Sequence, residues 1–164
     1  MLYLYFFVLY SIIGFIFEST VYKINKSNCY SGVLYGPYTI IYGIGGTISF
    51  FINNLLNIIK NPYLNIFLCF IIFVIICTLI EYIGGNIIKT LFNIDKWNYS
   101  NHKYHLGKYI CLDYALIWGI LALLFVKLFS NFFIQIFIII PNYLIITFLI
   151  IIFIDFIISL YIKK

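Results

Sequence analysis

The sequence predicts an all-α protein that crosses a membrane several times, and its composition is the first observation that predicts it. Of the 164 residues, 65% are hydrophobic and only 9% are charged, and the mean hydropathy is +1.10. Soluble domains contain about 25% charged residues, because water has to solvate their surface. A short chain exposes much of its surface even when folded, and 10 basic and 5 acidic residues cannot cover it. The composition therefore argues against a soluble enzyme and against a secreted disulfide scaffold.

The charged and sulfur-containing residues argue against further classes of protein, namely nucleic-acid binders and metalloproteins. All ten basic residues are lysines, and the absence of arginine argues against recognition of nucleic acid, where its planar side chain is favoured. The four cysteines form neither a C-x-x-C pair nor a zinc spacing. His102 and His105 lie three residues apart, with no third ligand near them in the sequence. We therefore expect no metal, no cofactor and no nucleic-acid partner.

The second observation is a series of five apolar segments, each able to cross a bilayer core of about 30 Å as a helix. They comprise about residues 2–22, 37–59, 63–83, 110–129 and 132–162. The first has no basic residues before it and no small-residue cleavage site, so we expect a retained helix rather than a signal peptide. The whole chain is then a single integral membrane domain, 1–164.

Proline and polar residues predict where these helices begin and end. Pro37 is suited to the first position of the second helix, and Lys60-Asn61-Pro62 forms a tight turn before the third. The third helix can extend to Phe92 along the membrane surface, and a polar and aromatic segment, residues 93–109, follows. Together they form a cytoplasmic interfacial segment, residues 84–109. Ser130-Asn131 is expected to separate the fourth helix from the fifth, which tilts or kinks at Pro141.

The third observation is the distribution of lysines, which predicts the orientation. The segments that follow the first, third and fifth helices hold eight of the ten lysines and share one side of the membrane, whereas only Lys60 and Lys127 fall on the other. By the positive-inside rule, the lysine-rich side is cytoplasmic. The N-terminus is therefore expected outside and the C-terminus in the cytoplasm, as in a multi-pass protein of the cell membrane.

Acidic residues within the apolar segments give the first candidate site. A carboxylate at the bilayer centre costs several kcal/mol, so such residues usually face protein or water. At a rise of about 1.5 Å per residue, four acids on four helices all fall in the cytoplasmic third. We expect an intramembrane polar cluster made of Ser11, Glu18, Glu81, Asp113 and Asp155. The alternative is that each acid extends to the membrane interface or pairs with a nearby lysine.

Several short motifs follow one another in a definite order. They are Tyr10-Ser11-x-x-Gly14-x-x-x-Glu18, Gly32-Val33-Leu34-Tyr35-Gly36-Pro37-Tyr38, Ile41-Tyr42-Gly43, Glu81-Tyr82-x-x-Gly85, Leu91-Phe92, Trp97-x-Tyr99-Ser100, Gly107-Lys108-x-Ile110-Cys111-Leu112 and Trp118-Gly119. In this order and spacing the chain resembles the small bacterial membrane proteins called putative ABC-transporter type IV, or CmpB-like, permeases. The resemblance covers roughly residues 5 to 125.

The chain departs from that family pattern mainly at polar positions. The family usually has Glu at the position of Lys89, Asp at Asn98 and Pro at Ile40, and it commonly has Asn at His105 and Arg at Lys108. Glycines and aromatic residues are kept while these positions differ. The resemblance therefore implies the family's fold more directly than a shared ligand.

The resemblance implies a permease-like membrane protein, which would form the membrane subunit of a transporter driven by a separate ATPase. Residues 85–90 end in Lys-Thr but lack the glycine that a phosphate-binding loop needs before its lysine, so the ATPase has to be another chain. Residues expected to dock that partner are Trp97, Tyr99, Ser100 and His105. The alternative for this segment is an anchor at the lipid headgroups. Five helices are few for a complete pathway, so a homo-oligomer or a partner subunit is expected.

Two other functions stay open at this stage. A non-transporting membrane scaffold or regulatory subunit would explain why packing residues match the family pattern while polar residues do not. An inner-leaflet lipid-modifying enzyme would use Glu18 or Glu81 as a general base, assisted by His102 or His105. The sequence contains no catalytic triad in a recognisable order, so we do not expect an enzyme.

Overall fold

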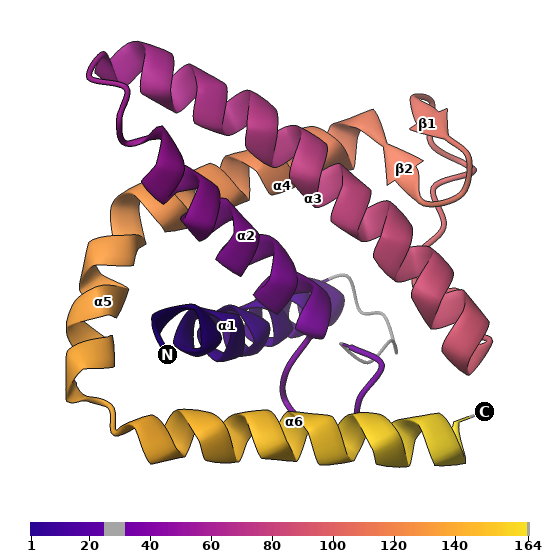
Figure 1. Ribbon diagram of the computed structural model, residues 1–164. Helices are drawn as coiled ribbons and strands as arrows, with labels where there is room; N and C mark the ends of the chain where they lie inside the picture. The colour runs from indigo at the N-terminus through magenta and orange to yellow at the C-terminus, as the bar shows by residue number, and fades with distance from the viewer. Residues whose placement is uncertain (25–31, 164) are drawn as a thin grey trace.

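The computed structural model describes residues 1–24 and 32–163 and is all-α apart from one short hairpin, as predicted (Figure 1). The elements are α1 (Leu2–Ile24), α2 (Ile40–Leu56), α3 (Pro62–Phe92), β1 (His105–Leu106), β2 (Ile110–Cys111), α4 (Leu112–Leu124), the π-helical segment η1 (Phe125–Phe129), α5 (Ser130–Ile139) and α6 (Asn142–Ile162). Strands β1 and β2 pair antiparallel, with His105 opposite Cys111.

Four helical stretches in the described part of the chain are long and apolar enough to cross a membrane. They are α1, α3, the continuous stretch Leu112–Ile139 formed by α4, η1 and α5, and α6. Helix α2 is apolar but has only 17 residues. The prediction of a membrane protein with several apolar helices is confirmed in this form. The five crossings and the orientation with the N-terminus outside stay predictions.

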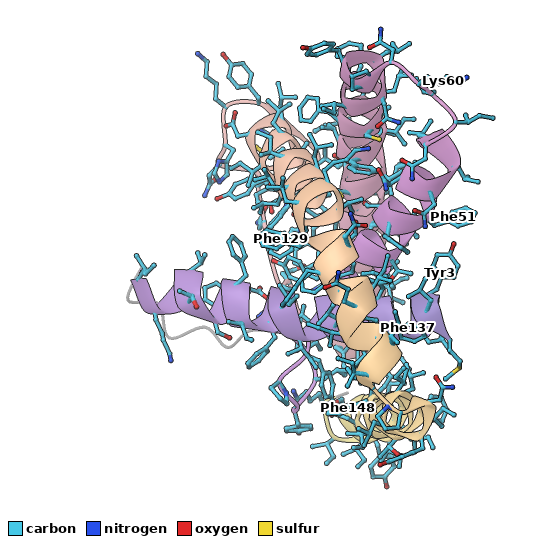
Figure 2. The ribbon with its side chains drawn as sticks, turned by 90° about the vertical axis from the view of Figure 1, so that its left-hand side faces the viewer. Tyr3, Phe51, Lys60, Phe129, Phe137 and Phe148 are labelled. Atoms are coloured by element: carbon cyan, nitrogen blue, oxygen red, sulfur yellow. The ribbon has the colours of Figure 1, made fainter. Side chains whose placement is uncertain are left out.

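The helices do not form a parallel bundle. In Figure 2, α3 and the α4–α5 stretch stand upright while α1 lies across them. Helix α6 is seen nearly end-on in that view and lies along the lower edge of Figure 1, below α1 and α2. The turn between α2 and α3, which carries Lys60, lies at the N-terminal end of α3, whereas the β1–β2 hairpin lies beside the middle of that helix.

Small residues allow α1 and α2 to cross closely. A Cβ atom on Gly43 would overlap the Ser11 hydroxyl, and one on Gly14 would overlap the ring of Tyr42. Ser11 is fully buried at this crossing and donates its hydrogen bond to the carbonyl oxygen of Phe7, at 2.7 Å. Small residues at helix contacts are typical of membrane proteins, because they let backbones approach.

An aromatic core fills the space where α1, α2, α3 and the η1–α5 stretch meet. The rings of Phe6 and Phe50 stack with their centroids 4.0 Å apart. The buried members of this core are Tyr5, Phe6, Tyr10, Phe50, Cys69, Phe73, Val126, Phe133 and Ile145. Large apolar side chains also cover the outside, for example Ile139, which is 81% exposed. A lipid solvent explains such an apolar surface, because lipid contact costs an apolar side chain nothing.

The prediction that Pro37 begins the second helix is wrong. Helix α2 begins at Ile40, and Thr39 before it is extended, with φ −125° and ψ 104°. Two contacts hold this stretch outside the helix. The Tyr38 hydroxyl donates to Asp155 at 2.6 Å, and the Thr39 amide donates to the carbonyl of Ser11 at 2.9 Å.

The predicted break at Ser130-Asn131 is also wrong. The helix that begins at Leu112 continues to Ile139, and the chain turns only at Pro141, with Ile140 extended at φ −78° and ψ 123°. Serine and asparagine cost a helix little, whereas proline lacks the amide hydrogen and forces the residue before it out of the helix. The fourth helix also starts later than predicted, because residues 110–111 belong to β2.

The third helix extends to Phe92, as the sequence allowed. The Asn61 side chain caps its start by accepting from the amides of Tyr63 and Leu64, at 3.0 and 3.2 Å. Its end is marked by Asn93, which has a left-handed backbone with φ 55°. Asparagine is among the few residues that adopt this conformation readily.

Candidate functional site

Glu81 lies on α3, is only 7% exposed, and is contacted from two other elements. Its Oε1 accepts hydrogen bonds from the Tyr99 hydroxyl at 2.5 Å and from the Trp118 indole nitrogen at 3.2 Å. Its Oε2 is buried and has no hydrogen-bond partner within the described residues. We call these three residues the Glu81 cluster.

The segment between α3 and α4, residues 93–111, positions Tyr99 beside Glu81. The Tyr99 amide donates to the carbonyl of Lys108 at 2.8 Å, and the His102 amide donates to the carbonyl of Tyr99 at 2.9 Å. The Tyr99 ring stacks on Tyr114 of α4, with centroids 4.6 Å apart. Tyr99 is therefore fixed by its own turn and by α4, and it is 7% exposed.

Tyr42 of α2 connects Glu81 to a second acid. Its ring packs edge-on against Trp118, with centroids 5.5 Å apart. Tyr42 also interacts electrostatically with both Glu18 and Glu81. Glu18 accepts a hydrogen bond from the Tyr22 hydroxyl at 2.9 Å. Of the predicted intramembrane residues, Glu18 and Glu81 thus share a neighbour in Tyr42.

Asp155 serves a different part of the molecule. Its Oδ1 accepts from the Tyr35 amide at 3.1 Å and the Ser159 hydroxyl at 3.0 Å, and its Oδ2 accepts from the Gly36 amide at 2.8 Å and the Tyr38 hydroxyl at 2.6 Å. Burial, and then the hydrogen bond to Asp155, raise the pKa of Tyr38 above its usual value. Asp155 therefore attaches the loop before α2 to α6 (Figure 1).

The remaining predicted cluster residues lie elsewhere. Ser11 is buried in the crossing of α1 and α2, and Asp113 is exposed in the first turn of α4. The sequence could place all these residues at similar depths, but it could not give the direction of each helix. Trp118 of the Glu81 cluster and its neighbour Tyr42 belong to the quoted motifs, and that membership was the one signal that could have found them.

Of the predicted docking residues, two pack inward and two lie at the surface. Trp97 packs edge-on against Tyr109 at 6.3 Å between centroids, and its indole nitrogen is buried with no partner in the described part of the chain. Tyr99 also faces inward. Ser100 and His105 are exposed, so the outward surface of the segment is formed by its polar residues and by the hairpin.

Asp95 fastens this segment to the end of α3. Its carboxylate lies 2.7 Å from the Lys108 ammonium and 3.4 Å from that of Lys89, and it accepts from the Tyr109 hydroxyl at 2.9 Å. Lys108, and then Tyr109, lower the pKa of Asp95 to about 2. The same contact raises the pKa of Lys108. Lys89, which differs from the family pattern, thus has a local partner.

A second polar group lies near the start of α3, which we call the Lys127 cluster. The Lys127 ammonium in η1 donates to Asn65 Oδ1 at 2.5 Å, and the Asn65 amide nitrogen donates to the carbonyl of Leu56 at 2.7 Å. Cys69 Sγ lies 3.8 Å from Asn65 Oδ1 and 4.0 Å from Asn53 Oδ1. The sequence prediction counted Lys127 as a lysine of the side opposite the cytoplasm, because it ended the fourth helix at Phe129.

A family model covers nearly the whole chain. The family described as putative ABC-transporter type IV matches residues 5–163. The protein belongs to this family. The suspected resemblance is therefore confirmed, and the match extends past the quoted motifs through α6 and Asp155. No curated protein and no solved structure matched the chain.

Proposed function

We propose that this member of the ABC-transporter type IV family is the membrane subunit of a transporter whose ATPase is a separate chain. Family membership supports a transporter-related membrane protein. The observation that carries the proposal is the bond between Tyr99 and Glu81, which joins a surface segment to a buried carboxylate. The 93–111 segment would receive the ATPase, and the Glu81 cluster would pass its movement to the helices.

The outward face of the segment has the character of a protein contact. Tyr104 is 54% exposed and Leu106, at the hairpin, is 73% exposed. Lysines flank them, and the Lys103 ammonium lies over the Tyr104 ring, 5.2 Å from its centroid. Aromatic and apolar side chains ringed by polar ones are typical of docking surfaces.

Tyr99, at the buried end of the 93–111 segment, would transmit a movement of that segment to Glu81. Displacing Tyr99 would remove one of the two donors to Glu81 Oε1. A buried carboxylate that loses a donor gains affinity for a proton or a cationic group. In this mechanism the ATPase changes what Glu81 binds, and Glu81 is the residue nearest to the transported species.

Co-purification from native membranes in mild detergent, followed by mass spectrometry, tests the partner. We expect a stoichiometric ATPase that is lost in the Tyr104→Ala/Leu106→Ala variant. Tyr143→Ala is the matched control, because Tyr143 is 66% exposed at the start of α6. The same preparation reports how many copies of the chain each complex contains.

Glu81→Gln separates docking from coupling in the same complex. We expect the ATPase to remain bound, while ATP hydrolysis by the complex falls at least about tenfold, a change of about 1.4 kcal/mol. Unchanged hydrolysis would contradict the role of Glu81 even if the partner is correct.

A non-transporting scaffold is the second candidate, and one observation favours it. Asp155 and Asp95 are both fully engaged in holding loops to helices, as in a protein whose polar residues serve structure. Recovery with a membrane protein other than an ATPase, and no effect of Glu81→Gln, would support this function over the first.

A further inference from the structure

We propose that His102, Cys111 and Asp113 form a zinc-binding site at the base of the hairpin. Each offers one ligand atom, and the three atoms all lie within 4.8 Å of one another. The residues come from the turn after Tyr99, from β2 and from the first turn of α4. This site adjoins Tyr99 but shares no residue with the Glu81 cluster, and it does not depend on the proposed ATPase.

The donor set suits zinc. Zn²⁺ binds imidazole nitrogen, thiolate sulfur and carboxylate oxygen at about 2.0–2.3 Å, usually with four ligands in a tetrahedron. Tetrahedral bonds of that length place neighbouring ligand atoms about 3.5 Å apart. The three ligand atoms, within 4.8 Å of one another, would have to approach by about an ångström, and Asp113 is exposed. Water or a further ligand would take the fourth position, as in sites that keep one position open.

Two of the three ligand residues, Cys111 and His102, are held in place by the hairpin and by ring packing. Cys111 is fully buried and pairs with His105 across the hairpin, so its position is fixed by the backbone. The His102 ring lies edge-on to Tyr99 and to Tyr114, at 5.6 and 5.3 Å between centroids. A zinc ion would therefore find its ligands held by packing and hydrogen bonds that exist without it.

The sequence prediction missed this site because it paired the wrong residues. His105 has the spacing that drew attention, but its Nδ1 lies 2.7 Å from the carbonyl oxygen of His102. It is not one of the three grouped residues. The antiparallel hairpin instead brings His102 close to Cys111, which lies nine positions further along the chain. His105 is consequently a natural control.

Zinc at this site would act on Tyr99 through its neighbours. The His102 amide donates to the Tyr99 carbonyl, and Tyr114 stacks on the Tyr99 ring. A metal bond from His102 to the start of α4 would close the turn that holds Tyr99 against Glu81. Zinc would thus stabilise the inward position of Tyr99.

Metal titration of the full chain in detergent tests the site. After treatment with a chelator, we expect one Zn²⁺ bound per chain, and Co²⁺ in its place should show a thiolate-to-metal charge-transfer band. Cys111→Ser should lose that band, and Asp113→Asn and His102→Gln should each weaken binding at least about tenfold. Binding should weaken as pH falls, because the ligands must be deprotonated.

The controls are His105→Gln and Cys77→Ser, both of which should bind zinc as the unmodified chain does. Loss of binding in either control equal to that in Cys111→Ser would overturn the site, as would the absence of stoichiometric metal in the unmodified chain. Cys111 is buried, so its variant could fail to fold. Asp113→Asn then decides, since Asp113 is exposed, and unchanged affinity in that variant would also overturn the site.

Discussion

Asp155 and Glu81 look alike in the sequence, since each is an acid within a long apolar run, yet the fold treats them differently. Asp155 receives two donors on each carboxylate oxygen. Glu81 receives both of its donors on one oxygen, and the other is buried without a partner in the described residues. A carboxylate with donors on both oxygens has completed its hydrogen bonds. A carboxylate with one oxygen left without a donor can still bind a proton or a cationic group.

This difference has an energetic meaning. An acceptor buried without a hydrogen bond costs about 1–3 kcal/mol, so folding alone does not favour it. Satisfied carboxylates such as Asp155 contribute stability through charge-assisted hydrogen bonds. The comparison therefore assigns Asp155 to the structure and makes Glu81 the candidate for function.

The largest expected effect is a difference in the free energy of unfolding between variants of the two acids. Asp155→Asn should lower the free energy of unfolding by about 2–3 kcal/mol, because an amide places hydrogens against donors that the carboxylate accepts from. Glu81→Gln should change it by about 1 kcal/mol or less, because its oxygen can keep both donors while the buried charge is removed. Thermal unfolding in detergent measures both.

The matched control for these variants is Asp113→Asn, measured after chelator treatment so that zinc binding plays no part, since Asp113 is exposed. Equal losses of stability in Asp155→Asn and Glu81→Gln would show that the hydrogen-bond pattern does not distinguish the two acids.

A smaller effect on stability is expected when Glu81 loses its tyrosine donor. Tyr99→Phe should lower the free energy of unfolding by about 1–2 kcal/mol, because Glu81 Oε1 then retains only the Trp118 donor. Tyr104→Phe, at an exposed tyrosine, should have no measurable effect. The double variant with Glu81→Gln gives the coupling energy, which we expect to reach at least about 0.5 kcal/mol. A coupling of zero would mean that the two side chains act independently.

The smallest effect concerns Asp95 and depends on pH. Its pKa of about 2 lies below the unfolded value of about 3.9. The stability that it contributes is therefore fully present above the unfolded pKa and is lost as pH falls through about 4 to 2. Hydrogen exchange in residues 95–109 should rise in that window, and Asp95→Asn should already exchange rapidly at neutral pH. Equal protection in both proteins would show that the ion pairs do not hold the segment.

The apolar segments predicted most of the helices because their length and hydrophobicity leave few alternatives in lipid. Two boundaries failed for reasons that lie outside the local sequence. Pro37 stays outside the helix because Asp155, more than a hundred residues away, holds the adjoining loop. The chain does not break at Ser130, since a helix surrounded by apolar groups retains its own hydrogen bonds.

The candidate site was predictable only in part. The sequence placed Glu81 in an apolar helix, where an acid faces protein or water, and in the structure Glu81 is 7% exposed. Which acids meet depends on how α1, α3 and α6 cross, and helix periodicity does not contain those angles. The grouping of His102 with Cys111 depends on a hairpin with strands of two residues, too short to leave a sequence signal.

The π-helical segment Phe125–Phe129 sets the rotation of everything that follows it. A π turn bonds each residue to the fifth along the chain instead of the fourth, so it absorbs one residue more than an α turn does. Each α-helical residue turns the helix by about 100°. If this stretch were a regular α-helix of the same length, the side chains of α5 would be rotated by roughly that angle. The π turn therefore sets the direction in which α5 presents its side chains.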